Sequence, residues 1–365
     1  MQNINPITVI SMPNRTTLPN PDTPWMMSQE VFQRLQGPNN SYKKCEITSN
    51  DREWLFVLSY FTSHPPKNRH IGRVHCIHTP ESIKGFEAKI LTSEKEAGVS
   101  VFDPHWDKEP ESMLREKVIN RWNGMTSHYS PFIIVGKEKR QDKYDKVKIL
   151  PLWHGSTAAK CDSICKTGFT SFGKHALVQG GASPGLNTDI GYFGSGIYFT
   201  NSARYAALDC YSDGNLLLAW VSMREPYPVV ADCEYPNEPK DMKTLKGGPA
   251  YENYNAHHIP VISVNPANNN CVIYYPCTAN QEPAFDEIVV FNNAQALTRF
   301  WVELEVTLPN PLFPSIKTFG KLQNKILELL DHPEVKQNPE LTNLLESKSK
   351  VLFSISGATP LDQDN

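Results

Sequence analysis

The sequence predicts a fold of the α+β class. After Lys146, short strand-like and helix-like segments follow one another in irregular order, unlike the regular alternation of a doubly wound sheet. The last strand-like run, residues 300–306, alternates in its side chains as a strand with two different faces does. One face carries Phe300, Val302, Leu304 and Val306, and the other carries Trp301, Glu303 and Glu305.

Size and charge limit the possible functions. The 365 residues are enough for one large domain of about 250 residues with extensions, or for two smaller domains. Charged residues make up 21% of the chain and the net charge is −3, which indicates neither disorder nor a nucleic-acid-binding surface. No apolar run of about 18 residues and no signal peptide occurs, so we expect a soluble protein without a membrane partner.

The cysteines favour a reducing compartment. Eight of them are spread without disulfide-like spacing, which predicts a cytoplasmic or nuclear protein, with a secreted effector left open. Cys161 and Cys165 lie at helical spacing together with Ala158 and Ile164, which favours core packing over metal binding. Since no Cys-x-x-Cys pair occurs either, we expect no metal cofactor.

Both ends of the chain differ from its middle. Five prolines within the first 24 residues predict an extended N-terminal arm over residues 1–41, with a short helix at 30–35. Residues 309–365 are predicted to form a C-terminal helical extension, in which a hairpin packed on the domain is favoured over a partner-binding helix pair. The apolar positions of its two helices are Phe319, Leu322, Ile326, Leu329 and Leu330, followed by Leu341, Leu344 and Leu345.

The first part of the central domain, predicted to span 42–308, begins with a helix after Asp51. Its apolar positions, at helical spacing, are Trp54, Val57, Leu58 and Phe61. A strand is expected at 71–77, and Thr79-Pro80 begins another helix. Residues of about 93–146 show no clear periodicity and are interpreted as an insertion.

A strand and a helix follow the insertion. Residues 149–154 are strand-like, although Pro151 indicates an edge strand or an irregular start. Ser156 is predicted to cap a helix at 157–166. Gly168 stands where a left-handed C-terminal cap is needed.

The remaining elements begin with a loop at 173–189, which contains glycine and serine. A strand at 196–200 follows, and then Asn201 or Ser202 is expected to cap a helix at 203–208. Further strands are predicted at 216–221, 287–291 and 300–306, with a helical turn at 294–297.

Three separated stretches combine a polar residue with a strand-like apolar run. They are 153–156 with His154, 191–200 with Tyr198, and 286–291 with Glu287. Each is weak alone, but their order and flanking residues suggest one cleft that holds and cleaves NAD. Cleavage passes through an oxocarbenium-like ribose. It therefore needs aromatic faces for the nicotinamide ring, close backbone for the carboxamide, and a carboxylate near the developing positive charge.

The sequence offers candidates for each of these needs. Tyr198 lies on the opposite strand face from its apolar neighbours, and Tyr205 on the next helix is a candidate for the second wall of an aromatic sandwich. Gly155 and Ser156 supply backbone and a hydroxyl beside His154, whose ring nitrogen is expected to bond a ribose hydroxyl. Ser202, one helical turn before Tyr205, is a candidate to bond the carboxamide.

Strand alternation allows only one of two adjacent carboxylates to enter the cleft. Glu287 shares a face with Val289, whereas Asp286 shares the other face with Ile288. Periodicity alone leaves the choice open, and the longer reach of glutamate slightly favours Glu287.

These stretches resemble the catalytic domain of the poly(ADP-ribose) polymerase family, the diphtheria-toxin-like ADP-ribosyltransferases. The resemblance runs from about Tyr42 to Leu308. It rests on four ordered motifs: Leu152-Trp153-His154-Gly155-Ser156, Gly191-Tyr192 with Gly194 to Phe199, Ser202-Ala203-Arg204-Tyr205, and Glu287 to Phe291 followed by Ala294-Gln295.

The resemblance implies an ADP-ribosyltransferase fold with a split mixed or antiparallel sheet, and NAD as co-substrate. It also implies a catalytic triad of His154, Tyr198 and Glu287. The NAD-binding residues would be His154, Gly155, Ser156, Tyr192, Tyr198, Ser202 and Tyr205, with nicotinamide contacts from Gly155 and Ser202 and ring stacking by Tyr205.

Two departures from the family pattern affect the expected activity. Asn201 stands where polymer-forming members commonly have a lysine, which favours transfer of a single ADP-ribose. The loop 173–189 matches no donor loop residue by residue, so the adenosine contacts stay unassigned.

We therefore expect an NAD-dependent ADP-ribosyltransferase acting on a protein acceptor. The alternatives are an NAD glycohydrolase and an inactive domain that binds NAD or ADP-ribose. His257-His258 is interpreted either as lining the acceptor side or as part of a loop. No nucleic-acid-binding module is evident.

Overall fold

The computed structural model describes residues 28–35, 42–128, 146–169, 191–264, 274–278, 280–306, 328–339, 341–343 and 345–346. The predicted loop 173–189 and most of the N-terminal arm lie outside these ranges. By its internal contacts the chain divides into two compact units, residues 1–306 and 307–365. None of the described helices is both long and apolar enough to cross a membrane.

The first unit is a mixed α and β structure, as predicted. Its strands are β1 (Lys43–Ile47), β2 (Arg69–His78), β3 (Lys148–Ser156), β4 (Ile197–Thr200), β5 (Asn215–Met223), β6 (Tyr227–Pro228), β7 (Ala256–Ser263), β8 (Tyr274–Pro276), β9 (Phe285–Val290) and β10 (Ala296–Val306). Its helices are α1 (Gln29–Leu35), α2 (Arg52–Ser63), α3 (Pro80–Glu96), α4 (Ser112–His128), α6 (Ala158–Thr167), α7 (Ala203–Ala206) and α8 (Lys240–Leu245), with 3₁₀ turns at Ser100–Phe102, Trp106–Lys108 and Asn293–Gln295.

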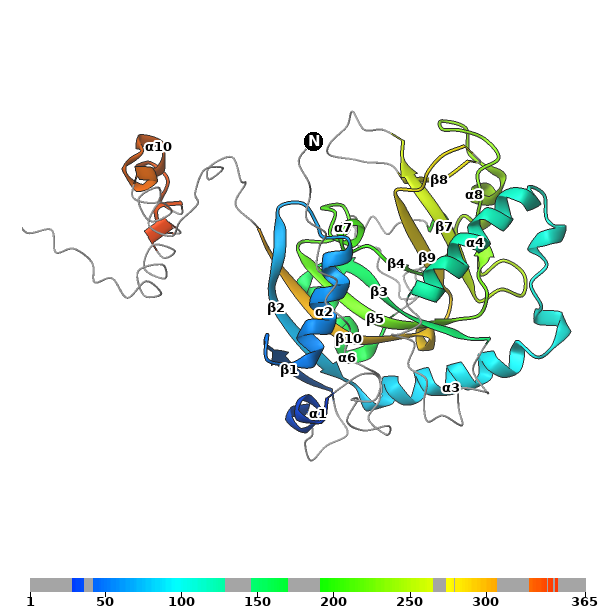
Figure 1. The fold of residues 1–365 in the computed structure, drawn as a ribbon, viewed down its shortest axis with the longest axis horizontal. Helices are drawn as coiled ribbons and strands as arrows, with labels where there is room; N and C mark the ends of the chain where they lie inside the picture. The colour runs from blue at the N-terminus through cyan, green and yellow to red at the C-terminus, as the bar shows by residue number, and fades with distance from the viewer. Residues whose placement is uncertain are drawn as a thin grey trace, which may run out of the picture. The chain divides into compact units, whose positions relative to one another are not determined.

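The strands form one sheet in the order β1-β2-β10-β5-β3-β4-β9-β7-β6, with β8 beside β7 (Figure 1). Its described ladders are antiparallel except β6 with β7. Between β3 and β4 only Trp153 and Thr200 pair, whereas β3 pairs with β5 along its whole length. This single pair divides the sheet into a first half, β1-β2-β10-β5-β3, and a second half, β4-β9-β7-β6 with β8. The predicted α+β class with a split, mostly antiparallel sheet is confirmed.

Helix α2 covers the first half of the sheet, but with a face rotated from the predicted one. The structure buries Phe56, Val57, Tyr60 and Phe61 on this helix. Phe56 stacks on Trp220 of β5 with ring centroids 5.7 Å apart, and the Tyr60 hydroxyl donates to the carbonyl of Pro151. Trp54 and Leu58 are only partly buried, because the aromatic side chains of β5 and β3 determine which face of the helix packs inward.

Three local predictions differ from the structure. Thr157, not Ser156, caps α6, since its side chain accepts from the amide of Lys160 while Ser156 is still in β3. Pro151 lies in a strand with neighbours on both sides. It is tolerated there because β4 reaches β3 only at Trp153 and so requires no amide hydrogen from residue 151. Gly168 is the C-cap of α6 as predicted and has a positive φ of 81°, but its ψ of 175° is not that of the predicted left-handed cap.

The interpretation of His257-His258 is also wrong, because both residues lie in β7 with fully buried side chains. The segment appeared loop-like in sequence, but residues 256–261 pair with β9 along the whole run. His257 accepts from the amide of Tyr251 through Nε2 at 2.9 Å, and its Nδ1 lies 2.7 Å from the carbonyl of Phe193. Because a carbonyl oxygen only accepts, Nδ1 carries the proton and the ring is neutral.

This histidine predicts acid-sensitive folding. Burial lowers the pKa of His257 to about 4, whereas an unfolded histidine titrates near about 6.5. As the pH falls below 6.5, His257 binds a proton in the unfolded state but stays neutral in the folded state. The stability present above that pH is therefore lost, by about 3 kcal/mol on reaching pH 4. Urea unfolding at about pH 7 and pH 5 should show about 2 kcal/mol of this loss. His257→Gln is expected to be less stable at neutral pH yet to lose less on acidification, and an unchanged pH dependence would contradict the assignment.

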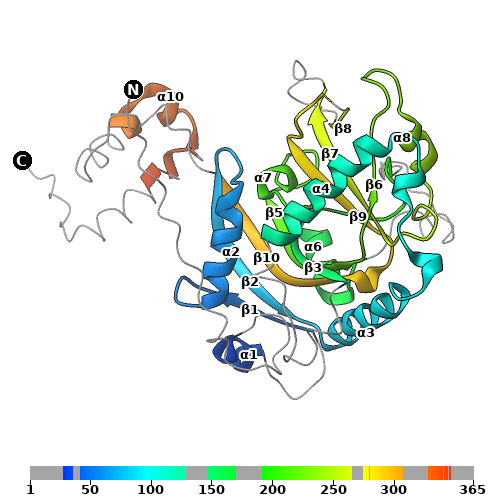
Figure 2. The same ribbon diagram turned by 45° about the vertical axis from the view of Figure 1, so that its right-hand side comes forward.

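The residues interpreted as an insertion are integrated with the sheet. Helix α4 lies across the second half of the sheet in both views (Figures 1 and 2), and Trp122 is 2% exposed. On the same helix, Arg115 forms a two-pronged ion pair with Asp241 of α8, with both distances 2.9 Å. Helix α4 therefore belongs to the first unit, and residues 129–145 lie outside the described ranges.

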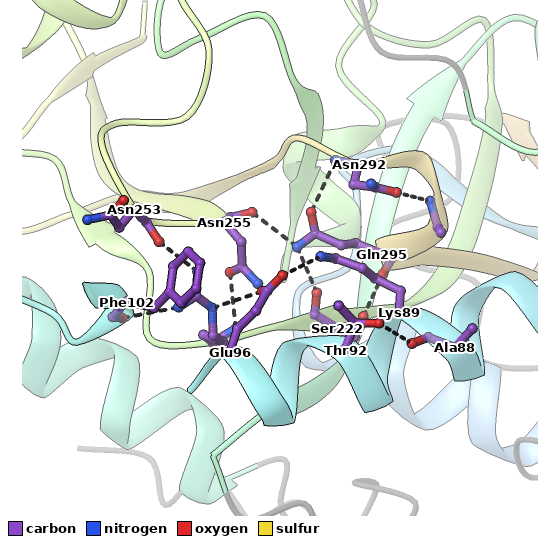
Figure 3. Close-up of polar contacts among 12 residues, drawn as sticks. Ala88, Lys89, Thr92, Glu96, Phe102, Ser222, Asn253, Asn255, Asn292 and Gln295 are labelled. Carbon is purple, nitrogen blue, oxygen red and sulfur yellow. Dashed lines mark hydrogen bonds and ion pairs between the residues drawn. The ribbon is translucent and has the colours of Figure 1, made fainter. Parts of the chain in front are cut away.

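Glu96 at the end of α3 lies near Phe102 and Asn253 (Figure 3), and the buried Arg224, which follows β5, joins these segments. Arg224 donates to the carbonyls of Phe102 and Asn253 at 3.1 and 2.6 Å, and its Nε lies 3.8 Å from Glu96. Close by, Gln295 donates to the carbonyls of Ser222 and Asn255, each at 3.0 Å. These bonds connect the loops at one end of the sheet and satisfy carbonyls that the strands leave unpaired.

The second unit has its own small apolar cluster. Helix α10 (Pro333–Lys336) contributes the buried Val335, which clusters with Leu345. Leu329, Leu330 and Leu341 pack against this pair. Of the predicted apolar positions, Phe319, Leu322, Ile326 and Leu344 lie outside the described residues.

Candidate active site

The two carboxylates of β9 lie on opposite faces of the sheet. Glu287 is paired with Thr200 and Val289 with Tyr198 of β4, and residues directly opposite one another share a face. Val289 belongs to the apolar cluster that contains Tyr205, whereas Ile288 belongs to the larger cluster that contains Trp153 and Trp220. Glu287 therefore lies on the face of Tyr198 and Tyr205, and Asp286 lies on the reverse face.

The Glu287 carboxylate accepts a hydrogen bond from the Tyr205 hydroxyl through Oε1. Glu287 is 8% exposed and Tyr205 is 3% exposed. Burial, and then the charge of Glu287, hold the pKa of Tyr205 well above its usual range, so this phenol stays protonated and remains a donor. The bond gives the carboxylate a defined orientation before any substrate is present.

Aromatic rings surround Tyr205 on several sides. Phe285 stacks on it with centroids 4.7 Å apart and planes inclined by 11°. Tyr274 and Tyr211 meet it edge to face, at 4.5 and 5.3 Å, and the Tyr211 hydroxyl lies 3.2 Å from that of Tyr205. One face of the Tyr205 ring is thus covered by Phe285, and with the two further rings the side chain is almost fully buried.

His154, near the end of β3, is held in one tautomer. Its Nδ1 lies 2.8 Å from the carbonyl of Tyr198, so Nδ1 donates and Nε2 is the acceptor in the neutral ring. Phe169 and Phe199 pack against the ring at 5.2 and 5.7 Å. Burial lowers the pKa of His154, so the imidazole is neutral at pH 7 and offers Nε2 to a hydroxyl donor.

Tyr198 uses its hydroxyl within the protein. It donates to the carbonyl of Gly194 and accepts from the amide of Phe193, both at 2.9 Å. Its ring packs against the apolar cluster that contains Tyr205 and Val289. The side chain is therefore anchored at its tip, and what it can present to a ligand is the face of the ring.

Gly155 has a structural reason to be glycine that the sequence did not reveal. A Cβ atom at this position would lie 2.0 Å from the carbonyl oxygen of Ala206 and 3.3 Å from the Cβ of Ser212. The backbone of α7 therefore fits directly against β3. This contact brings the Ser202 to Tyr205 turn beside the strand that carries His154.

Ser202 begins α7 as predicted. Its Oγ accepts from the amide of Tyr205 at 3.3 Å, and its own amide donates to Thr200 Oγ1 at 3.1 Å. Because the cap uses the oxygen as acceptor, the hydroxyl proton is not consumed by it. Ser156, at the end of β3, is 7% exposed.

Tyr192 differs from the other candidates because it is 43% exposed. Lys246 Nζ lies 5.3 Å from its ring centroid, a cation–π contact. Gly191 before it has φ of 74°, and a Cβ there would lie 2.5 Å from the carbonyl of Gly194. The turn 191–194 thus directs Tyr192 outward while it anchors the Tyr198 hydroxyl.

Two cavities lie elsewhere in the described part of the chain. One, of 310 Å³, is lined by Arg224 and Trp122, and the other, of 150 Å³, by Tyr227 and Asp241. Neither lining includes His154 or Glu287. Among the residues described, no cluster of three or more metal-ligating side chains occurs.

The structure adds residues that the sequence reasoning missed. Phe285 and Tyr274 complete the aromatic surroundings of Tyr205, and Arg121 binds Asp286 behind the sheet. Phe285 shares the face of Glu287 by simple alternation, so that signal was present in the sequence. The contact of Arg121 with Asp286 spans 165 positions, and no local pattern predicts it.

One comparison with known proteins identifies a family. A family model described as the poly(ADP-ribose) polymerase catalytic domain matches residues 124–306. The match begins within α4 and ends with β10, so it contains His154, Tyr198 and Glu287. No curated protein matches the chain.

Proposed function

The chain belongs to the poly(ADP-ribose) polymerase family by its catalytic domain, and from this premise we propose that it is an NAD-dependent protein ADP-ribosyltransferase that adds single ADP-ribose units. Domains of this family use NAD as substrate and modify protein acceptors. The observation that carries the proposal is the buried Glu287 carboxylate, oriented by Tyr205 on the same sheet face as Tyr198.

In the proposed reaction the bond between the ribose C1 and the nicotinamide nitrogen breaks. The electron pair of that bond goes to the pyridinium nitrogen, so neutral nicotinamide leaves, and positive charge develops on the ribose. A nucleophilic atom of the acceptor protein forms the new bond to C1 and loses its proton. Glu287 stabilises the positive ribose and accepts or directs the acceptor proton.

The other site residues hold the donor. His154 accepts a hydrogen bond from a ribose hydroxyl at Nε2, because its Nδ1 donates to the carbonyl of Tyr198. Gly155 and Ser202 bind the carboxamide through backbone and hydroxyl groups, and Ser156 lies beside them. The ring faces of Tyr198 and Tyr205 enclose the nicotinamide, and Tyr192 lines the outer rim of the pocket.

The position of Asn201 supports single transfer over polymer formation. Its Nδ2 donates to Asp286 at 3.2 Å and lies 3.5 Å from Met125 Sδ. The side chain that replaces the lysine of polymer-forming members is therefore directed to the reverse face, away from Glu287. No cation at position 201 is available to hold the end of a growing ADP-ribose chain.

Incubation of the protein with NAD labelled in its adenylate moiety tests the proposal. Label that becomes covalently attached to protein as single units supports it. Polymers attached to protein would contradict the single-transfer part. Free ADP-ribose with nicotinamide and no labelled protein would establish the glycohydrolase alternative, and unchanged NAD with measurable binding would establish an inactive binding domain.

Tyr205→Phe tests the hydrogen bond that orients Glu287. The ring remains for stacking, so the KM for NAD should change little, whereas kcat should fall about tenfold because a hydrogen bond to a charged group is lost. Tyr211→Phe is the matched control, since the neighbouring hydroxyl that it removes bonds to the Tyr205 hydroxyl, and its kcat should fall less than that of Tyr205→Phe. An increase in KM at constant kcat for Tyr205→Phe would instead assign the hydroxyl to donor binding.

A further inference from the structure

A buried polar network lies directly behind the strand position of Glu287. Asp286 is 2% exposed and accepts two hydrogen bonds from Arg121, at 2.6 and 2.7 Å. The Nε2 of His258 lies 2.9 Å from the same carboxylate, and Asn201 donates to it at 3.2 Å. The network thus gathers side chains from α4, β7, β9 and the end of β4.

The carboxylate of this network is ionised throughout the neutral range. Burial by itself raises the pKa of Asp286, but the hydrogen bonds from His258 and Arg121 outweigh it and hold that pKa far below its usual range. The His258 ring is fully buried, and its Nε2 is the ring nitrogen that carries the hydrogen donated to Asp286. Each donor is therefore directed at one fixed acceptor.

The network contacts both halves of the candidate site from its reverse side. Asp286 immediately precedes Glu287, so fixing its side chain fixes the backbone from which Glu287 projects. Asn201 immediately precedes Ser202, which caps α7 and supports Tyr205. Arg121 belongs to α4 and is itself partly exposed, with a side chain 38% accessible.

We propose that Arg121 and Asp286 are positioning residues, which hold the Glu287 carboxylate and the Ser202 turn in register for the transfer reaction. This inference rests on the proposed function. Neither residue touches the substrate; they act through the backbone of β9 and through Asn201. Helix α4 is then part of the catalytic apparatus, because it supplies the cation that fixes the catalytic strand.

A second arginine on α4 separates positioning from stability. Arg115 forms a two-pronged ion pair with Asp241, with both distances 2.9 Å, and also donates to the carbonyl of Pro228 at 2.6 Å. Its side chain is 3% exposed, so it is more deeply buried than Arg121. Its partners lie on α8 and β6, and they touch neither β9 nor Asn201. Loss of this pair should destabilise α4 at least as much as loss of the Arg121 pair.

The test compares Arg121→Gln with Arg115→Gln in the full chain. For Arg121→Gln we expect kcat for nicotinamide release to fall about 10- to 100-fold, as for a misplaced catalytic group. The Kd for NAD should rise by a smaller factor, because the Ser202 turn is loosened as well. Arg121→Lys should recover part of the loss. Arg115→Gln should lower the melting temperature more than Arg121→Gln does, while kcat measured well below melting stays near that of the parent protein.

Hydrogen exchange gives a readout that does not need turnover. In Arg121→Gln the amides of residues 201–203 and 286–288 should exchange faster, whereas in Arg115→Gln they should not. If the parent protein does not turn over NAD, the proposed function is wrong. Hydrogen exchange still decides in that case whether Arg121 positions the Glu287 strand. The inference is overturned if Arg121→Gln keeps the parent kcat, if both variants lose activity in proportion to stability, or if exchange at these amides is unaltered.

Discussion

Glu287→Gln is expected to lower nicotinamide release by about 100- to 1,000-fold, the cost of removing a group that stabilises transition-state charge. The amide keeps the size of the side chain and an oxygen that accepts from Tyr205, so the local structure should be preserved. The substitution removes the negative charge that stabilises the positive ribose. The measurements are kcat from nicotinamide release and the Kd for NAD by calorimetry.

The Kd for NAD should remain within about threefold of the parent value, because the carboxylate interacts mainly with charge that develops in the transition state. Glu305→Gln is a suitable control, since Glu305 is an exposed carboxylate on β10, and it should be neutral. Turnover by Glu287→Gln equal to that of the parent protein would refute the assignment of this residue. A loss of binding as large as the loss of turnover would assign it to donor binding instead.

Gly155→Ala is expected to damage both the fold and the site. The added methyl would lie 2.0 Å from the carbonyl oxygen of Ala206, a backbone atom that moves only if α7 moves. Such overpacking costs about 1–3 kcal/mol. Because Ser202 and Tyr205 move with α7, nicotinamide release should also fall by about 100-fold.

The control for this glycine is Gly124→Ala on α4. A Cβ at Gly124 would meet no atom within 4 Å, and alanine is favoured over glycine inside a helix by about 1 kcal/mol. Urea unfolding should therefore show the two substitutions changing the free energy of unfolding in opposite directions. A Gly155→Ala protein as stable and as active as the parent would show that α7 does not depend on the contact with β3.

The sequence predicted most of the strands and helices around the site because those signals are local. The strands predicted at 149–154, 196–200 and 216–221 were recognised by their apolar runs, and Gly168 by its position after a helix. The short strands β1 and β6, the buried β7 and the helices α4 and α8 were missed. Strand β7 contains His257-His258 and follows Tyr254, and this composition is typical of a loop. In the structure both histidines have buried hydrogen-bond partners.

Local sequence patterns also failed to predict the orientation and the partners of side chains that contact residues far away in the chain. Glu287 and Asp286 were equivalent by alternation, and the pairing of β9 with β4 separated them. The segment interpreted as an insertion contains α4, whose Arg115 and Arg121 bind partners 126 and 165 positions away. Side chains directed at such partners follow no period in the sequence.

The order of the motifs, the two faces of each strand and the turn residues were determined by the sequence alone, because they depend on neighbours within a few positions. The tertiary structure alone decided which face of β9 meets Tyr205, why residue 155 must be glycine, and where the charge of Asp286 is balanced. Those outcomes depend on strand order and register, which are fixed only when segments far apart in the chain bury their surfaces against one another.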